Sequence, residues 1–207
     1  MHEVDEQKHG GNSAGEPESQ LHCSGSNPDA ARENIVAHLT QITEMIRQKA
    51  TGQSSDPYLS FEEFVLRNGR HFDPVPFPAR LGYRGYQALL KSCFRNAYLL
   101  ARHHPNKLRY AEGFAIPGGR FDCPFMHAWC VDLQDRAIDP TWHDGVAYYG
   151  VIFDMGYAAE VVKVKREYGV LDNWKQRFPL LTGEHAAWKP SGHDDREPQP
   201  EGERKQQ

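Results

Sequence analysis

The segment HAWCVDLQDRAIDPTW, residues 127–142, constrains the fold of this chain more than any other. Its first half alternates as a half-buried strand does, which places His127 and Trp129 on one face of that strand. A polar interruption follows Leu133, and a second apolar run stops at Pro140, where the missing N–H group ends strand pairing. The segment therefore predicts an antiparallel hairpin.

This hairpin brings a carboxylate close to an imidazole. With a turn at residues 133–135, Asp139 lies opposite His127 or within a residue or two of it, and opposed side chains have Cβ atoms about 4.5–5.5 Å apart. A slip of one residue in the register would send the two side chains to opposite faces. In the favoured register we predict a hydrogen bond between Asp139 and His127.

A cysteine upstream of the hairpin lies in an apolar, helix-like run. Ser92 could cap this helix and place Cys93 in its first turn, where free N–H groups and the helix dipole favour a thiolate and could stabilise an oxyanion. A start near Gln87 would put Cys93 in mid-helix, but Gly82 and Gly85 favour the later start. The Gln87 side chain is a second oxyanion candidate, or simply a polar surface residue.

Cys93, His127 and Asp139 together could form a thiolate nucleophile. A free thiol, with a pKa near 8.5, is only slightly ionised at neutral pH, and a nearby imidazole can take its proton. A carboxylate then fixes the imidazole tautomer and stabilises the imidazolium. Each residue also has a structural interpretation: a small core cysteine, a satisfied buried histidine, and an aspartate that starts a turn. Their joint occurrence in this order favours the catalytic interpretation.

These residues also carry a family resemblance. The cysteine helix, LRYAEGFA at 108–115, HAW at 127–129 and IDPTW at 138–142 together resemble the core of the transglutaminase-like superfamily, which has a papain-like Cys-His-Asp fold. The resemblance covers about a quarter of the chain. It implies an α+β domain in which the cysteine-bearing helix packs on an antiparallel sheet.

The same resemblance implies a role for each residue: Cys93 as nucleophile, His127 as general base and acid, and Asp139 as orienting carboxylate. The superfamily includes peptidases, amidases, protein crosslinkers, peptide N-glycanase-like enzymes and members that have lost activity. We therefore expect a cysteine hydrolase or acyltransferase that acts on a peptide, protein or small amide through a thioester acyl-enzyme, without a cofactor. The fold leaves the substrate, and the choice between water and an amine as acceptor, open.

Aromatic residues and one arginine are candidates for the substrate cleft. The candidates are Trp129, Trp142, Tyr148 and Arg84. Together with Tyr149, the aromatic residues also support a second hypothesis. In that hypothesis the chain is a catalytically inactive module on the same fold and binds a peptide.

Two further cysteines lie near the histidine. Cys123, His127, Cys130 and His143 could be read as zinc ligands, but their spacing matches none of the familiar paired-cysteine patterns. Strand alternation also points Cys130 away from His127. We expect structural cysteines and no metal.

Composition argues against some partners and compartments. The net charge is -4 and the pI is about 6.2, so no global basic surface argues for nucleic acid. No apolar run approaches the ~20 residues that cross a bilayer, and we expect no signal segment and no membrane contact. The four cysteines form no disulfide framework. We expect a cytoplasmic protein and make no prediction of its oligomeric state.

The 207 residues fit one domain between two tails. Residues 1–27 and 187–207 are polar, lack apolar periodicity, and are predicted to be disordered. Residues 28–186 form the single transglutaminase-like domain. An amphipathic helix from Pro28 begins this domain, and Gly52 ends that helix.

Further elements are expected within the domain. Ser60 and Glu63 form a capping-box pattern that starts a short helix, and this helix ends at Asn68. Residues 146–153 are predicted to form a strand. Residues 157–178 mix apolar and charged positions in a pattern that does not separate helix from strand.

Overall fold

The computed structural model describes residues 27–50, 55–82, 86–119 and 123–183. The predicted tails lie outside these residues, except for Asn27. Within them the chain is an α+β protein, as expected. No helix in this part of the chain is both long and apolar enough to cross a bilayer.

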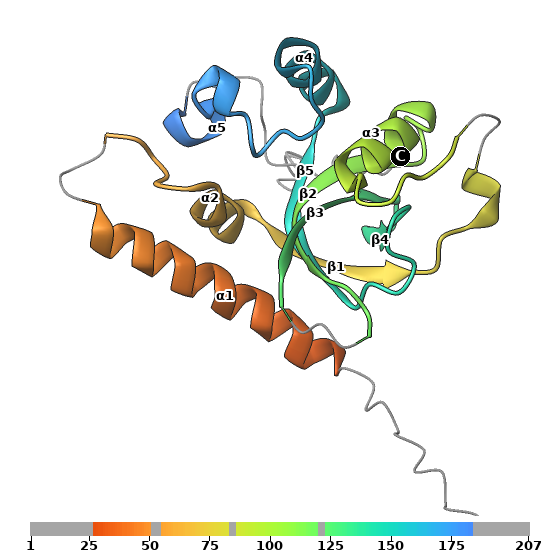
Figure 1. The fold of residues 1–207 in the computed structure, drawn as a ribbon. Coiled ribbons are helices and arrows are strands. Elements are labelled where there is room, and N and C mark those ends of the chain that lie inside the picture. Colours follow the sequence, from red (N-terminus) through yellow and green to blue (C-terminus); the bar gives the residue numbers. More distant parts are fainter. Residues whose placement is uncertain (1–26, 51–54, 83–85, 120–122, 184–207) are drawn as a thin grey trace, which may run out of the picture.

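Helices and strands alternate irregularly along the chain (Figure 1). They are α1 (Pro28–Lys49), α2 (Phe61–Asn68), β1 (Arg70–Val75), the 3₁₀ helix η1 (Ala79–Leu81), α3 (Cys93–His103), β2 (Arg109–Ile116), β3 (Phe125–Val131), β4 (Arg136–Ile138), β5 (Ala147–Phe153), α4 (Met155–Lys165), the 3₁₀ helix η2 (Trp174–Gln176) and α5 (Pro179–Thr182). The strand predicted at 146–153 is β5. The stretch 157–178, left unassigned from the sequence, contains most of α4 and all of η2.

The five strands pair in the order β1-β4-β3-β2-β5, and β5 pairs with β1 in turn, so the sheet closes on itself. The predicted hairpin is present as β3 and β4. The expectation of a wholly antiparallel sheet is wrong at one pair, because β1 and β4 are parallel. Parallel neighbours need a long crossover, and here that crossover includes α3, β2 and β3.

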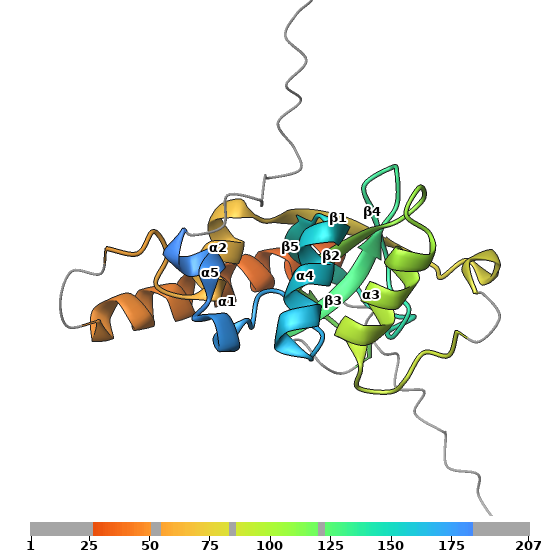
Figure 2. The ribbon, with the colours of Figure 1, turned by 90° about the horizontal axis from the view of Figure 1, so that it is seen from above.

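The closed sheet has an apolar inner face and an apolar outer face. The inner cluster contains residues of all five strands and none of the helices: Phe72, Ala111, Ala115, Trp129, Val131, Ala137, Tyr148 and Ile152. Helices cover the outer face, with α3 on β3 and β2, and with α1 and α2 on β5 (Figures 1 and 2). This arrangement places the first turn of α3 near β3, the strand that bears His127.

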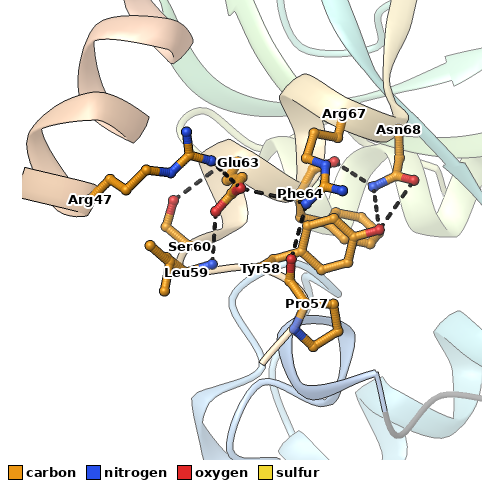
Figure 3. A network of polar contacts seen from close by, with 9 residues as sticks. All are labelled: Arg47, Pro57, Tyr58, Leu59, Ser60, Glu63, Phe64, Arg67 and Asn68. Carbon is orange, nitrogen blue, oxygen red and sulfur yellow. Dashed lines mark hydrogen bonds and ion pairs between the residues drawn. The ribbon is translucent and has the colours of Figure 1, made fainter. Parts of the chain in front are cut away.

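Glu63 joins the two N-terminal helices (Figure 3). Its buried carboxylate accepts hydrogen bonds from Arg47 of α1 at 2.7 Å and from the N–H of Leu59 at 2.9 Å. The Glu63 N–H donates to Ser60 Oγ at 3.2 Å, so one half of the predicted capping box is confirmed. The other half of a capping box would be a hydrogen bond from the N–H of Ser60 to the Glu63 carboxylate. Here the carboxylate accepts from the N–H of Leu59 instead.

Candidate active site

Cys93 is the first residue of α3. Ser92 occupies the cap position, but its hydroxyl donates to Leu90 O at 3.4 Å and makes no capping hydrogen bond to the helix. The predicted late helix start is therefore confirmed, and the predicted capping role of Ser92 is wrong. The first N–H groups of a helix have no carbonyl partner within it. They are available to an oxygen atom near the partly exposed Cys93 side chain.

His127 and Asp139 form the predicted hydrogen bond. The β3–β4 register pairs Cys130 with Ile138, so Asp139 falls opposite Trp129, two residues from His127. The His127 Nε2 atom lies 2.6 Å from Asp139 Oδ2, and the two side chains are 1% and 3% exposed. Because water hardly reaches the pair, the hydrogen bond is not weakened by solvent screening.

Four donors surround the Asp139 carboxylate. His127 and the Tyr148 hydroxyl donate to Oδ2, the latter at 2.9 Å. The N–H groups of Thr141 and Trp142 donate to Oδ1 at 2.7 and 2.9 Å. Asp139 thus accepts the N–H groups of the following turn with one oxygen and lies in hydrogen-bond contact with the imidazole through the other.

The His127 imidazole lies between Asp139 and Cys93. Burial by itself lowers the pKa of His127, but hydrogen bonds to Asp139 and to the Cys93 side chain, with the negative charges of both, raise it to about 9. Asp139 takes Nε2, which leaves Nδ1 for the sulfur. With this pKa the imidazole carries a proton at neutral pH.

Trp142 covers the imidazole. Its ring stacks on His127 with centroids 3.7 Å apart and planes 8° from parallel. Phe125 contacts the indole edge-on, with ring centroids 6.3 Å apart. A pocket of about 340 Å³ lies beside these two rings and is also lined by Pro117, Gly118 and Asp144. Trp142 thus lines a pocket next to His127, and the loop at Gly118 borders the same pocket.

The prediction that Trp129 lines the cleft is wrong, and the other aromatic candidates, Tyr148 and Tyr149, are buried as well. Trp129 is fully buried inside the closed sheet, against Phe72 and Tyr148. Tyr148 is buried, donates to the Asp139 carboxylate and lines a small pocket of about 210 Å³ together with Asp139 and Trp142. The Tyr149 hydroxyl donates to Leu66 O at 3.0 Å. The aromatic cleft of the peptide-binding hypothesis is therefore not formed by these residues.

Two further candidates find no support among the described residues. Gln87 is exposed in the segment before α3, and none of the hydrogen bonds among the described residues involves its side chain. Arg84 lies outside the described residues. The N–H groups at the start of α3 lie at the Cys93 end of that helix and are the better placed candidates for this role.

Asn96 is a site residue that the sequence reasoning missed. It is fully buried on α3, and its amide donates to Leu89 O at 2.8 Å and to Thr141 Oγ1 at 3.0 Å, while its carbonyl accepts from the Leu89 N–H at 3.0 Å. It therefore ties the segment before Cys93 to the turn after Asp139. The available signal was a polar residue on the apolar face of the helix, three positions after the cysteine.

Two other cysteines of the described residues, Cys123 and Cys130, differ in their surroundings from Cys93 of the candidate triad Cys93, His127 and Asp139. The Cys130 thiol donates to Ala97 O of α3 at 3.3 Å, and burial raises the pKa of Cys130. Cys123 is exposed, and His143 stacks on Phe77. Among the described residues no three histidine, cysteine or carboxylate side chains come together as a metal site would require.

Comparisons of this chain with protein-family models, with curated proteins and with solved structures give no match. A functional assignment therefore depends on the geometry of the site.

Proposed function

We propose that this protein is a cysteine-dependent hydrolase or acyltransferase. The observation that carries the proposal is the buried hydrogen-bonded pair of His127 and Asp139, with Cys93 close enough to the imidazole to help raise its pKa. A structural histidine needs hydrogen-bond partners of any kind. This one is held between a carboxylate and a partly exposed sulfur, which is the arrangement that activates a thiol.

We further propose a transglutaminase-like core. Three features support it: a helix that begins with the cysteine, a strand that carries the histidine, and an aspartate at the end of the next strand. The chain order Cys93, His127, Asp139 agrees with that superfamily. The parallel β1–β4 pair and the closure of the sheet are details on which the proposal does not depend.

In the proposed acylation step the Cys93 thiolate attacks the carbonyl carbon of an amide or ester. The carbonyl π electrons move to oxygen, and the N–H groups at the start of α3 stabilise the resulting oxyanion. His127 then gives its proton to the leaving amine or alcohol as the carbon–nitrogen or carbon–oxygen bond breaks. A thioester on Cys93 and a neutral imidazole remain.

In the second step the neutral imidazole accepts a proton from water or from an amine as it attacks the thioester. The carbon–sulfur bond breaks, and the imidazolium–thiolate pair is restored. Water gives hydrolysis, and an amine gives acyl transfer. Asp139 stays ionised throughout and keeps the Nε2 proton of His127 in place.

The proposed substrate is a peptide, a protein or a small amide. It would approach along the pocket that Phe125 and Trp142 line, because Trp142 stacks on the catalytic imidazole. Because the mechanism needs a reduced thiol, we place the protein in a reducing compartment, the cytoplasm.

An acyl-enzyme trap with p-nitrophenyl acetate tests the proposal. The parent chain carries Cys23→Ser and Cys123→Ser, so that Cys93 and the buried Cys130 are the remaining thiols. We expect a burst of one nitrophenolate per chain and an acetyl group on the peptide that contains Cys93. The burst should disappear in Cys93→Ala and in His127→Ala, and persist in Cys130→Ala.

A parent chain that folds but shows no burst and no acetylated Cys93 would contradict the proposal. In that case the inactive binding module becomes the better interpretation. Acetylation that persists in Cys93→Ala would likewise exclude Cys93 as the nucleophile.

A further inference from the structure

A second pocket lies apart from the triad, between the β3–β4 turn, the end of β1 and the chain before β2. Its volume is about 350 Å³, within the range of small-molecule sites. The cysteine, the histidine and the stacked tryptophan do not line it. The proposed catalysis therefore does not account for this pocket.

The floor of the pocket is apolar. Leu81, Leu108 and Ile138 are buried beneath it. Leu133, at the tip of the β3–β4 turn, stands at its edge with 67% of its surface exposed. An apolar ligand that covers this leucine would remove its apolar surface from water, which is energetically favourable.

The edge of the pocket is positively charged. Arg80, Lys107 and Arg136 line it, together with one acidic residue, Asp132. Arg136 neutralises that carboxylate at 2.7 Å. Within the described part of the chain, Arg80 and Lys107 form no ion pair. Two cations thus remain without a counter-charge, in a protein whose net charge is -4.

We propose that this pocket binds a small apolar carboxylic acid. The apolar body lies on Leu81, Leu108 and Ile138 and is covered by Leu133, while the carboxylate lies between Arg80 and Lys107. Apolar walls with a few placed charges are the usual composition of a small-molecule site, and the charges select the sign of the ligand. The inference does not depend on the proposed activity, because no residue of the triad takes part.

A matched set of naphthalene probes tests this site by NMR titration of the full chain. The probes are 2-naphthoate, 2-naphthalenemethanol and 2-naphthylmethylamine, which are similar in size and differ in charge. We expect 2-naphthoate to bind most tightly and the amine most weakly. The amide signals of Leu108 and Leu133 should shift, and the indole signal of Trp142 should not.

Two sets of variants separate the charge contacts from the apolar contacts. The double change Arg80→Gln with Lys107→Gln should weaken 2-naphthoate about tenfold and leave the alcohol unchanged. The control, Arg102→Gln with Lys163→Gln, changes the net charge equally at exposed positions outside the pocket and should have little effect. Leu133→Ser should weaken all three probes.

The proposal is wrong if 2-naphthoate binds no more tightly than the alcohol, or if the two double variants weaken it equally. It is also wrong if the probe shifts Trp142 and leaves the amides of Leu108 and Leu133 unchanged, since the ligand would then occupy the catalytic cleft. Each outcome is independent of whether Cys93 forms an acyl-enzyme.

Discussion

Replacing Asp139 by asparagine should invert the tautomer of His127 and leave the fold intact. The Asp139 Oδ1 atom accepts two backbone N–H groups, from Thr141 and Trp142. An asparagine must therefore place its oxygen on that side, because its NH₂ group there would face two donors. The NH₂ group then takes the place of Oδ2 and donates to His127 Nε2. The remaining imidazole proton moves to Nδ1, which can no longer accept the proton of Cys93.

The size of the effect follows from the ion pair that is lost. His127 has a pKa of about 9 beside Asp139 and Cys93, against an ordinary value of about 6.5. This difference corresponds to about 3 kcal/mol of net stabilisation of the imidazolium by Asp139 and Cys93, after the opposing cost of burial. Loss of the carboxylate together with the wrong tautomer should slow acylation by about 10³–10⁴-fold.

The assay is the single-turnover rate of thioester formation at pH 7, with thermal unfolding measured on the same samples. Asp154→Asn is the control, because Asp154 caps α4 and asparagine caps a helix as well as aspartate does. If Asp139→Asn acylates as fast as the control while both variants remain folded, the orienting role of Asp139 is refuted.

Three further changes test individual contacts. Asn96→Ala removes the hydrogen-bond partners of Leu89 and Thr141 and should lower the free energy of unfolding by about 1–3 kcal/mol in denaturant unfolding. An unchanged unfolding midpoint would show that the hydrogen bonds of Asn96 do not stabilise the fold. Tyr148→Phe removes one hydrogen bond to the triad carboxylate and should cost about 1.5–3 kcal/mol by the same measurement, with Cys93 still reactive. Burial raises the pKa of Glu112, so its proton is held more tightly in the folded than in the unfolded chain. The stabilisation by protonated Glu112 is complete below the pKa that Glu112 has in the unfolded chain, and it is lost as pH rises through its pKa in the folded chain. Glu112→Gln should therefore flatten the fall of the free energy of unfolding over this pH range. An unchanged slope would exclude Glu112 as the source of that fall.

Local patterns predicted the parts of the site that depend on short stretches of sequence. The alternation around His127, the polar turn and Pro140 define the hairpin and its register, which is why the contact between His127 and Asp139 could be predicted to within two residues. The glycines before Cys93 similarly indicated where α3 begins. In each case the determining residues lie close together along the chain.

Contacts between distant segments could not be predicted in this way. Alternation divides the side chains of β3 between two faces but does not say which face the helices cover, so Trp129 was assigned to a cleft and lies inside the sheet. The role of Tyr148 depends on β5 crossing near the end of β4, and that of Asn96 on α3 meeting the turn at Thr141. The parallel pairing of β1 and β4 depends on how the whole sheet closes.

The rate of Cys93 alkylation by iodoacetamide as a function of pH tests the central claim most directly. The chain carries Cys23→Ser and Cys123→Ser and is compared with and without His127→Ala. If His127 holds the proton of Cys93, alkylation should remain fast at pH 6, where a free thiol with a pKa near 8.5 reacts slowly, and His127→Ala should restore the pH profile of a free thiol. Identical profiles in the two proteins, each following that of a free thiol, would contradict the assignment of Cys93, His127 and Asp139 as a catalytic unit.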